Sequence, residues 1–133
     1  MSRGLTPSEN DESEIILYTT PDGAVHIEVF FQNESFWLSQ KKMAELFGVD
    51  TRTANEHLQN IYDTKELEKH STIRKIRIVQ KEGSRDVARN IDFYNLDAII
   101  AVGYRVNSFQ ATQFRIWATK TLREFIIYRF VLK

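Results

Sequence analysis

The sequence predicts an α+β fold, a winged helix-turn-helix with an N-terminal β-hairpin and C-terminal helices. Three observations support this prediction. Residues 38–62 have the spacing of two short helices joined by a tight turn, residues 72–93 alternate like a β-hairpin, and residues 109–131 follow one long helical pattern. The 133 residues are enough for one hydrophobic core. We therefore expect one domain over residues 14–133, preceded by a disordered acidic tail over residues 1–13.

The first part of this domain is typical of β-structure. Residues Glu14–Thr20 are mostly apolar or β-branched, and Pro21–Gly23 is a strong turn signal. The next segment alternates, with Val25, Ile27 and Val29 on the side expected to be buried and His26, Glu28 and Phe30 on the other. A second turn at Asn33–Ser35 leads to a short strand at Phe36–Leu38. These segments predict the N-terminal hairpin and a third strand.

The next segment predicts two helices. Ser39 can cap the first helix, and Gly48 follows its last apolar residue, where a left-handed residue commonly ends a helix. Asp50 or Thr51 can cap the second helix. Apolar residues recur at helical spacing in both helices, at Met43, Ala44 and Phe47 and then at Ala54, Leu58 and Ile61. Leu58 stands one place later than the usual last apolar position of a helix-turn-helix, which His57 occupies here.

The second helix has a polar face that suits base recognition. Asn and Gln can bond bidentately to adenine, Arg can bond to guanine, and Glu can accept from cytosine. A helix-turn-helix places such residues of its second helix in the major groove. The candidates for base contact are Thr51, Arg52, Asn55, Glu56 and Gln59. The alternative is an ordinary helical hairpin packed in a core.

A basic β-hairpin follows directly. We expect a helical turn at Thr64–Lys69, a strand at Thr72–Gln80, a loop at Lys81–Arg85 and a return strand that ends near Phe93. Seven bases and two acids lie between Lys69 and Arg89. Such a hairpin can hold phosphates and supply affinity without sequence information. The phosphate candidates are Ser39, Gln40, Lys41, Arg74, Lys75, Arg77, Lys81, Ser84, Arg85 and Arg89. The alternative is a solvated hairpin whose charges block aggregation.

The distribution of charge favours a nucleic-acid partner although the formal net charge is zero. Residues 1–34 carry seven acids and one base, a balance of −6, and residues 35–133 carry a balance of +6. Such asymmetry between two parts of a chain is more informative than the total. The basic part can therefore meet phosphate while the acidic part faces elsewhere.

Two helices complete the predicted domain. Asn95 or Tyr94 opens the helix Leu96–Tyr104, which Gly103 weakens near its end, and Asn107–Ser108 is a capping pair before the helix Phe109–Val131. The last turns of this helix are apolar almost all round. They predict a homodimer or a partner domain, docked through Phe125, Ile126, Ile127 and Phe130. The alternative is that the helix only closes the domain's own core.

Several function classes lack the residues that they need. The chain has no cysteine, and its three histidines do not form a metal-binding spacing. No nucleophile elbow, P-loop or dinucleotide fingerprint is present, so we expect no enzyme, no metal and no cofactor. No apolar run is long enough for a membrane span, and the acidic N-terminus is not a signal peptide. We therefore expect a cytoplasmic protein without membrane contact.

Three runs resemble a known family: Phe36–Thr53, Ile91–Ser108 and Ala111–Lys120. They are similar to the bacterial RhuM ("virulence protein") family, and the likeness covers roughly residues 14–130. More weakly, the layout resembles the N-terminal DNA-binding modules of phage regulators of the Bro and Rha kind. The resemblance implies a bacterial winged-helix DNA-binding protein from a mobile element or genomic island, with no catalytic residues. Family members are longer, which implies that this chain is truncated.

Taken together, these features predict sequence-specific binding of double-stranded DNA in a regulatory role. The first alternative is a protein-interaction module that docks a toxin or effector domain through its last helix. The second is an RNA-binding protein, but RNA-binding proteins usually stack bases on exposed aromatic side chains. The aromatic residues here fall mostly on apolar faces, so we rank RNA third.

Overall fold

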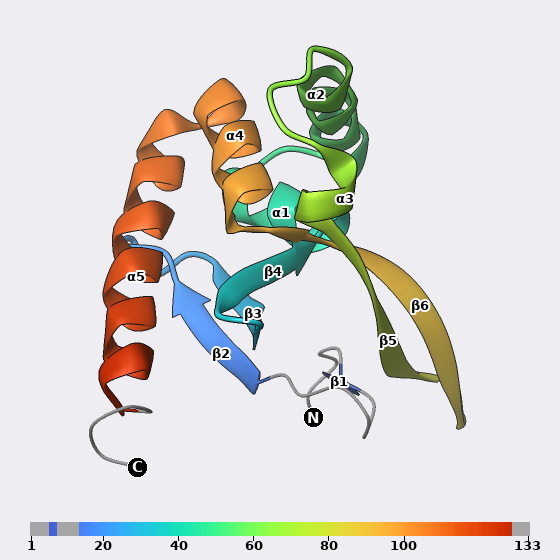
Figure 1. The fold of residues 1–133 in the computed structure, drawn as a ribbon. Coiled ribbons are helices and arrows are strands. Elements are labelled where there is room, and N and C mark those ends of the chain that lie inside the picture. Colours follow the sequence, from blue (N-terminus) through green and yellow to red (C-terminus); the bar gives the residue numbers. More distant parts are fainter. Residues whose placement is uncertain (1–5, 8–13, 129–133) are drawn as a thin grey trace.

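The computed structural model describes residues 6–7 and 14–128 and shows an α+β fold (Figure 1). Within these residues, one antiparallel sheet has the strand order β1-β5-β6-β4-β3-β2. The strands are β1 Thr6–Pro7, β2 Glu14–Thr19, β3 His26–Gln32, β4 Ser35–Ser39, β5 Ile73–Glu82 and β6 Arg85–Asn95. The helices are α1 Gln40–Phe47, α2 Thr51–Asp63, α3 Lys69–Thr72, α4 Leu96–Val106 and α5 Ser108–Ile127.

The expected α+β class, N-terminal hairpin and C-terminal helices are confirmed. β2 pairs with β3 along its whole length, and β3 pairs with β4 across a tight turn. Asn33 and Glu34 of that turn have φ of 52° and 57°. Two consecutive positive φ values are the geometry of the two-residue turn that best fits the twist of a hairpin.

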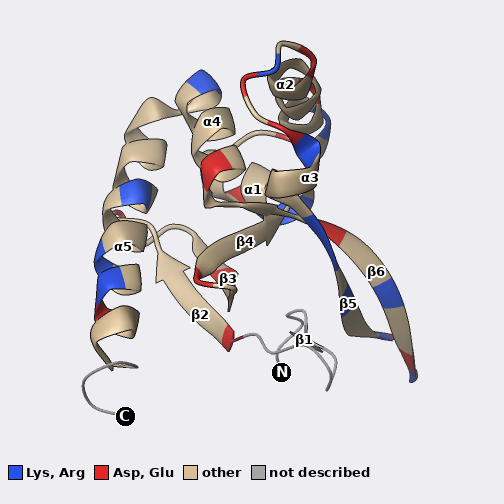
Figure 2. Cartoon of the chain, in the orientation of Figure 1, with Lys and Arg blue, Asp and Glu red and all other residues tan. Residues whose placement is uncertain are grey.

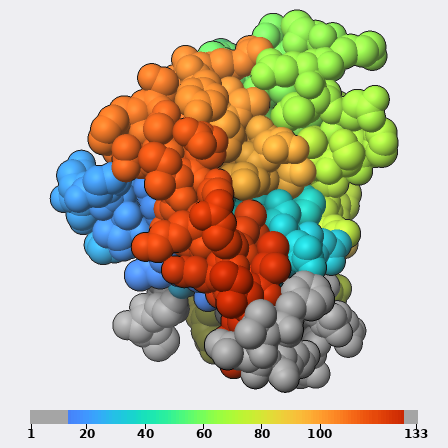
Figure 3. Space-filling model, turned by 60° about the vertical axis from the view of Figure 1, so that its left-hand side comes forward, coloured from blue at the N-terminus to red at the C-terminus, as the bar shows by residue number. Residues whose placement is uncertain are grey.

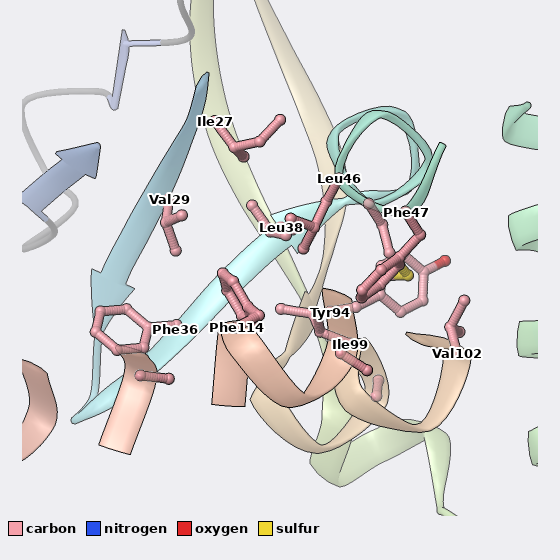
Figure 4. Packing of buried hydrophobic residues seen from close by; sticks show 14 of the residues in the cluster. Ile27, Val29, Phe36, Leu38, Leu46, Phe47, Tyr94, Ile99, Val102 and Phe114 are labelled. Carbon is pink, nitrogen blue, oxygen red and sulfur yellow. The ribbon is translucent and has the colours of Figure 1, made fainter. Parts of the chain in front are cut away.

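Helices α1, α4 and α5 cover one face of the sheet and enclose the main core. Figure 4 shows its side chains meeting between β3, β4 and the three helices. The largest contributions come from aromatic and branched residues, among them Ile27, Phe36, Leu38, Phe47, Ile99 and Phe114. In α5, the Trp117 ring lies 4.9 Å from the rings of both Tyr18 and Phe36. The long helix is therefore anchored on β2 and β4 together.

The opposite face of the sheet carries a second apolar cluster, which the alternation of β3 did not indicate. Phe30, expected on the non-core side of the strand, is buried there. Its ring stacks on Phe93 with 4.9 Å between centroids. The other buried members are Trp37, Ile76 and Ile78. Both faces of the central strands are thus apolar, which secures the hairpin β5–β6 to β3 and β4.

The predicted caps of α1 and α2 are confirmed. Ser39 Oγ accepts from the Lys42 backbone N–H at 3.3 Å, and the Asp50 carboxylate accepts from the Thr53 N–H at 2.8 Å. Gly48 has φ of 74°, a conformation that costs glycine little. The six residues predicted for the apolar faces of α1 and α2 are all buried.

Two local predictions were wrong. The short helix after α2 covers Lys69–Thr72 instead of Thr64–Lys69, because a turn with Lys65 at φ 65° first ends α2. Helix α4 continues past Gly103 to Val106, two residues beyond the predicted end at Tyr104. Gly103 is buried where α4 crosses α1 and α5.

The hairpin β5–β6 belongs to the sheet at its base and projects beyond the helices at its tip (Figure 1). β6 pairs with β4 through Phe93, Tyr94 and Asn95, and β5 pairs with β1 at Ile78 and Val79. Within the expected tail, Thr6–Pro7 therefore form a short strand, and the other residues of that tail lie outside the described part of the chain.

Candidate nucleic-acid interface

Helix α2 presents a polar face opposite its buried one. Ala54, Leu58 and Ile61 fix the helix on the core, so that the face with the predicted base-contact residues turns outward. Thr51, Arg52, Glu56 and Gln59 are exposed. Arg52 and Glu56 lie 3.5 Å apart, with 87% and 65% of their side chains exposed. An ion pair this exposed contributes little to stability, and both groups stay available to a ligand.

Asn55, the remaining candidate of α2, is partly buried and joins a hydrogen-bond chain. The Gln40 side-chain amide donates to Asn55 Oδ1 and to the Tyr94 hydroxyl, both at 3.0 Å. Burial raises the pKa of the Tyr94 hydroxyl, so this group stays neutral and accepts the bond. One amide thus links the start of α1, the polar face of α2 and strand β6.

A cleft of about 360 Å³ lies beside this link. It opens between the first turn of α1 and the edge of β6 that β4 leaves uncovered. The residues that line it are Ser39, Gln40, Lys41, Lys42, Gln80, Ile91, Asp92 and Tyr94. Lys75 donates to Asp92 at 2.8 Å, and this hydrogen bond is the main reason why the pKa of Lys75 is raised. The cleft therefore continues onto the hairpin.

The register of β5 and β6 divides the basic residues of the hairpin between two faces. Residues on one strand share a face with every second neighbour and with the residue directly opposite. Lys75, Arg77 and Lys81 are therefore on the face of Tyr94, whereas Arg74, Arg85 and Arg89 are on the face of Phe93. Figure 2 shows charged residues of both signs along the two strands. We call the first set, with the polar face of α2 and Gln40, Lys41 and Asp92, the helix-side surface.

Acids neutralise part of this basic set. Lys75 pairs with Asp92 at 2.8 Å, and Lys81 lies 3.6 Å from Asp86. Within the described residues, Lys41 and Arg77 form no ion pair. These two cations are therefore the readiest to meet an anion on the helix-side surface.

Three of the phosphate candidates outside this surface, Ser39, Arg74 and Arg89, have other contacts. Arg74 donates to Gln32 at 2.5 Å and lies over the Trp37 ring, 5.4 Å from its centroid. Arg89 makes two bonds of 2.9 Å to the Glu82 carboxylate. Ser39 is buried and uses its oxygen as the cap of α1. Ser84 and Arg85 are exposed at the tip of the hairpin.

The sequence reasoning missed Tyr94 and Asp92 as parts of this surface. Tyr94 stands 54 residues after Gln40, so no local spacing could connect them. The only available signal was the alternation of β6, which places Asp92 and Tyr94 on the same face as the bases of β5. Alternation indicates which residues share a face of β6, but it does not indicate which element lies beside that face.

The last helix meets its own core more than expected. Of the residues predicted to bind a partner, Phe125 packs against Phe31 with 4.7 Å between ring centroids. Ile126 and Ile127 are exposed, and Phe130 lies outside the described residues. The alternative, that α5 closes the domain's own core, holds for its inner face, while Ile126 and Ile127 at the end of the described helix are exposed.

Metal-binding clusters and membrane-spanning helices are both absent from the described residues. No group of three or more His, Asp or Glu side chains in this part of the chain could hold a metal ion. Among its helices, none has the length and apolar character that a membrane crossing requires.

Comparison with known proteins relates part of the chain to a family. Neither a curated protein nor a solved structure gives a significant match. The model of the "Virulence protein RhuM family" matches residues 71–133, which contain β5, β6, α4 and α5. Two of the three runs that carried the resemblance, at residues 91–108 and 111–120, lie within this match. The segment of residues 71–133 is therefore similar to the Virulence protein RhuM family.

Proposed function

We propose that this protein binds double-stranded DNA as a winged helix-turn-helix. Helix α2 would lie in the major groove, and the basic residues of β5 on the helix-side surface would lie along the DNA backbone. One observation carries the proposal. The Gln40 amide binds both Asn55 of α2 and Tyr94 of β6, so that the polar face of α2 adjoins the basic face of the hairpin. Base contact and phosphate contact would then occur on one continuous surface.

The described contacts suggest a division of roles on that surface. Arg52 and Gln59 are exposed and suited to bind guanine and adenine edges. Asn55 already accepts a bond from Gln40, which orients its amide and leaves the amide nitrogen free to donate. Lys41 and Arg77 would meet phosphates first, because neither has an ion pair to break.

The number of cations on the helix-side surface sets the expected dependence on salt. Lys41, Lys75, Arg77 and Lys81 could neutralise four phosphates. The slope of log affinity against log salt is about −0.9 for each phosphate neutralised, so the affinity should fall roughly 10²-fold between 50 and 200 mM salt.

The test is a salt-resolved binding titration with random duplex DNA and with a selected sequence. We expect Arg52→Ala/Gln59→Ala to retain the salt slope of the wild type and to lose its preference for the selected sequence. Both side chains are exposed, so the thermal midpoint of the variant should stay unchanged. Absence of binding by the wild type at 50 mM salt would refute the proposal.

A second candidate function is docking of a partner protein through α5. The exposed apolar side chains of its outer face favour it: Phe109, Ile116, Ile126 and Ile127. In that case the double variant of α2 would leave function intact, and Ile126→Asp/Ile127→Asp would abolish it.

A further inference from the structure

The two edges of the sheet differ in how they resist further pairing. One edge ends in β1, which has two residues and contains Pro7. Short edge strands and proline both discourage the addition of another strand, because proline offers no N–H. The other edge ends in β2, which has six residues and no proline, lysine or arginine. Its single charged residue, Glu14, stands at its first position. Within the part of the chain that the structure describes, this edge lacks the usual protection.

β2 also exposes apolar side chains beside that open edge. Ile15 and Leu17 point to the same face and are 40% and 58% exposed. Tyr18, on the other face, is buried against Phe114 and Trp117, and so holds the strand in place. A long, apolar edge strand with free backbone groups is a site for pairing with another strand.

We propose that β2 pairs antiparallel with β2 of a second copy of this chain and joins the two sheets across a two-fold axis. The side chains of β2 favour a second copy of the same strand as the partner. With the axis at Ile16, each Ile15 lies opposite Leu17 of the partner subunit, and the four exposed apolar side chains form one cluster. No like charges face each other, because Glu14 falls opposite Tyr18 of the partner subunit. The surface is thus complementary to itself, as a two-fold interface requires.

The last turn of α5 adds to this interface. Phe125 packs on Phe31, and Phe31 pairs with Glu14, so the end of α5 lies over the first residues of β2, on the sheet face opposite to Ile15 and Leu17. Ile126 and Ile127 are exposed there. Figure 3 shows the N-terminal hairpin in blue at the surface beside α5 in orange and red. A pair of six-residue strands alone is smaller than the roughly 1,200 Å² that stable interfaces bury, so the end of α5 supplies the remaining area.

The molar mass in solution tests the proposal without DNA, and therefore independently of the proposed function. Light scattering after size exclusion should give a dimer for the wild type and a monomer for Leu17→Lys, which places a charge beside the axis in the apolar cluster. Phe109→Lys is the matched control, since Phe109 is equally exposed but lies at the other end of α5. It should remain a dimer. A monomeric wild type, or a Leu17→Lys protein as dimeric as the wild type, would overturn the proposal.

Cysteine cross-linking tests the register. The chain contains no cysteine, so an introduced pair reports one contact. Under mild oxidation, Ile15→Cys mixed with Leu17→Cys should give a disulfide-linked dimer, because opposite residues bring their Cβ atoms within about 5 Å. Each variant alone should give much less, since its two cysteines are diagonal. Equal cross-linking of all three samples, or none, would contradict the register.

Discussion

A single glycine sets the spacing of three helices. A Cβ atom on Gly103 would lie 2.6 Å from Phe47 Cζ and 2.7 Å from the Ala111 Cβ. Both distances are shorter than real Cβ contacts. Glycine is therefore required at this position for the close packing of the three helices. This packing outweighs the lower helix propensity of glycine.

We expect Gly103→Ala to destabilise the protein by about 1–2 kcal/mol. Overpacking of a core costs about 1–3 kcal/mol, and the better helix propensity of alanine returns up to about 1 kcal/mol. Denaturant unfolding would measure the change. Adding Phe47→Leu should recover part of the loss, because it removes the ring that the new methyl group meets. A stabilised Gly103→Ala protein would show that α4 can shift away without cost.

Gln40 is a second residue on which other side chains depend, because its amide donates to both Asn55 and Tyr94. Replacing Gln40 by Leu leaves the Tyr94 hydroxyl and Asn55 without this donor. If Asn55 needs that bond for its orientation, Gln40→Leu should reduce DNA sequence preference nearly as much as Asn55→Ala. The double variant should then be no worse than either single variant, which a double-mutant cycle would detect. Additive losses would mean that Gln40 does not act through Asn55.

At the scale of elements, the start of α2 depends on the Asp50 carboxylate. The Thr53 backbone N–H that it accepts lowers its pKa below the ordinary value of 3.8. A depressed carboxyl pKa stabilises the fold above the unfolded pKa, and this contribution disappears as the pH falls through the folded pKa.

We therefore expect the thermal midpoint advantage of the wild type over Asp50→Ala to be full at pH 7 and to disappear as the pH falls through the lowered pKa of the Asp50 carboxyl. Asp50→Asn is the control, because asparagine also caps but does not titrate. Its advantage over Asp50→Ala should persist at low pH. Equal pH profiles for all three proteins would show that the cap does not contribute to stability.

The two faces of the hairpin allow a matched comparison of single charges. Arg77 and Arg85 are both exposed, and neither forms an ion pair within the described residues, but they are on opposite faces. If the helix-side surface meets DNA, Arg77→Ala should reduce the salt slope by about 0.9 and Arg85→Ala should leave it unchanged. A larger loss from Arg85→Ala would place the opposite face on the DNA.

At the scale of the whole molecule, α5 unites the strands at one end of the sheet. Trp117 touches Tyr18 of β2, Phe36 of β4 and Phe114 of its own helix. Because Trp117 is partly buried, we expect Trp117→Ala to cost about 3 kcal/mol of unfolding free energy, the lower end of the usual loss for a large aromatic core residue. The neighbouring Ile116, half exposed, should tolerate alanine almost without change. Chemical denaturation of both variants would compare them.

How much was predictable from sequence depends on the distance between interacting residues. The caps at Ser39, Asp50 and Asn95 each act on a backbone group three residues further along, so the local sequence specifies them. The register of β5–β6 follows from a short loop and alternation. The Phe30–Phe93 stack and the link from Gln40 to Tyr94 join residues more than 50 positions apart. Alternation indicates that a strand has two faces but not that both are covered.

The insertion of the hairpin into the sheet has a consequence for the thermodynamics of binding. Because β6 is hydrogen-bonded to β4 and its inner face packs on Phe30 and Trp37, its base cannot swing relative to α2. A binding surface that is rigid before it meets its ligand loses little conformational entropy on association. A larger share of the free energy of the contacts at the helix-side surface would then contribute to the affinity for DNA. The duplex, and not the protein, would have to adapt its shape.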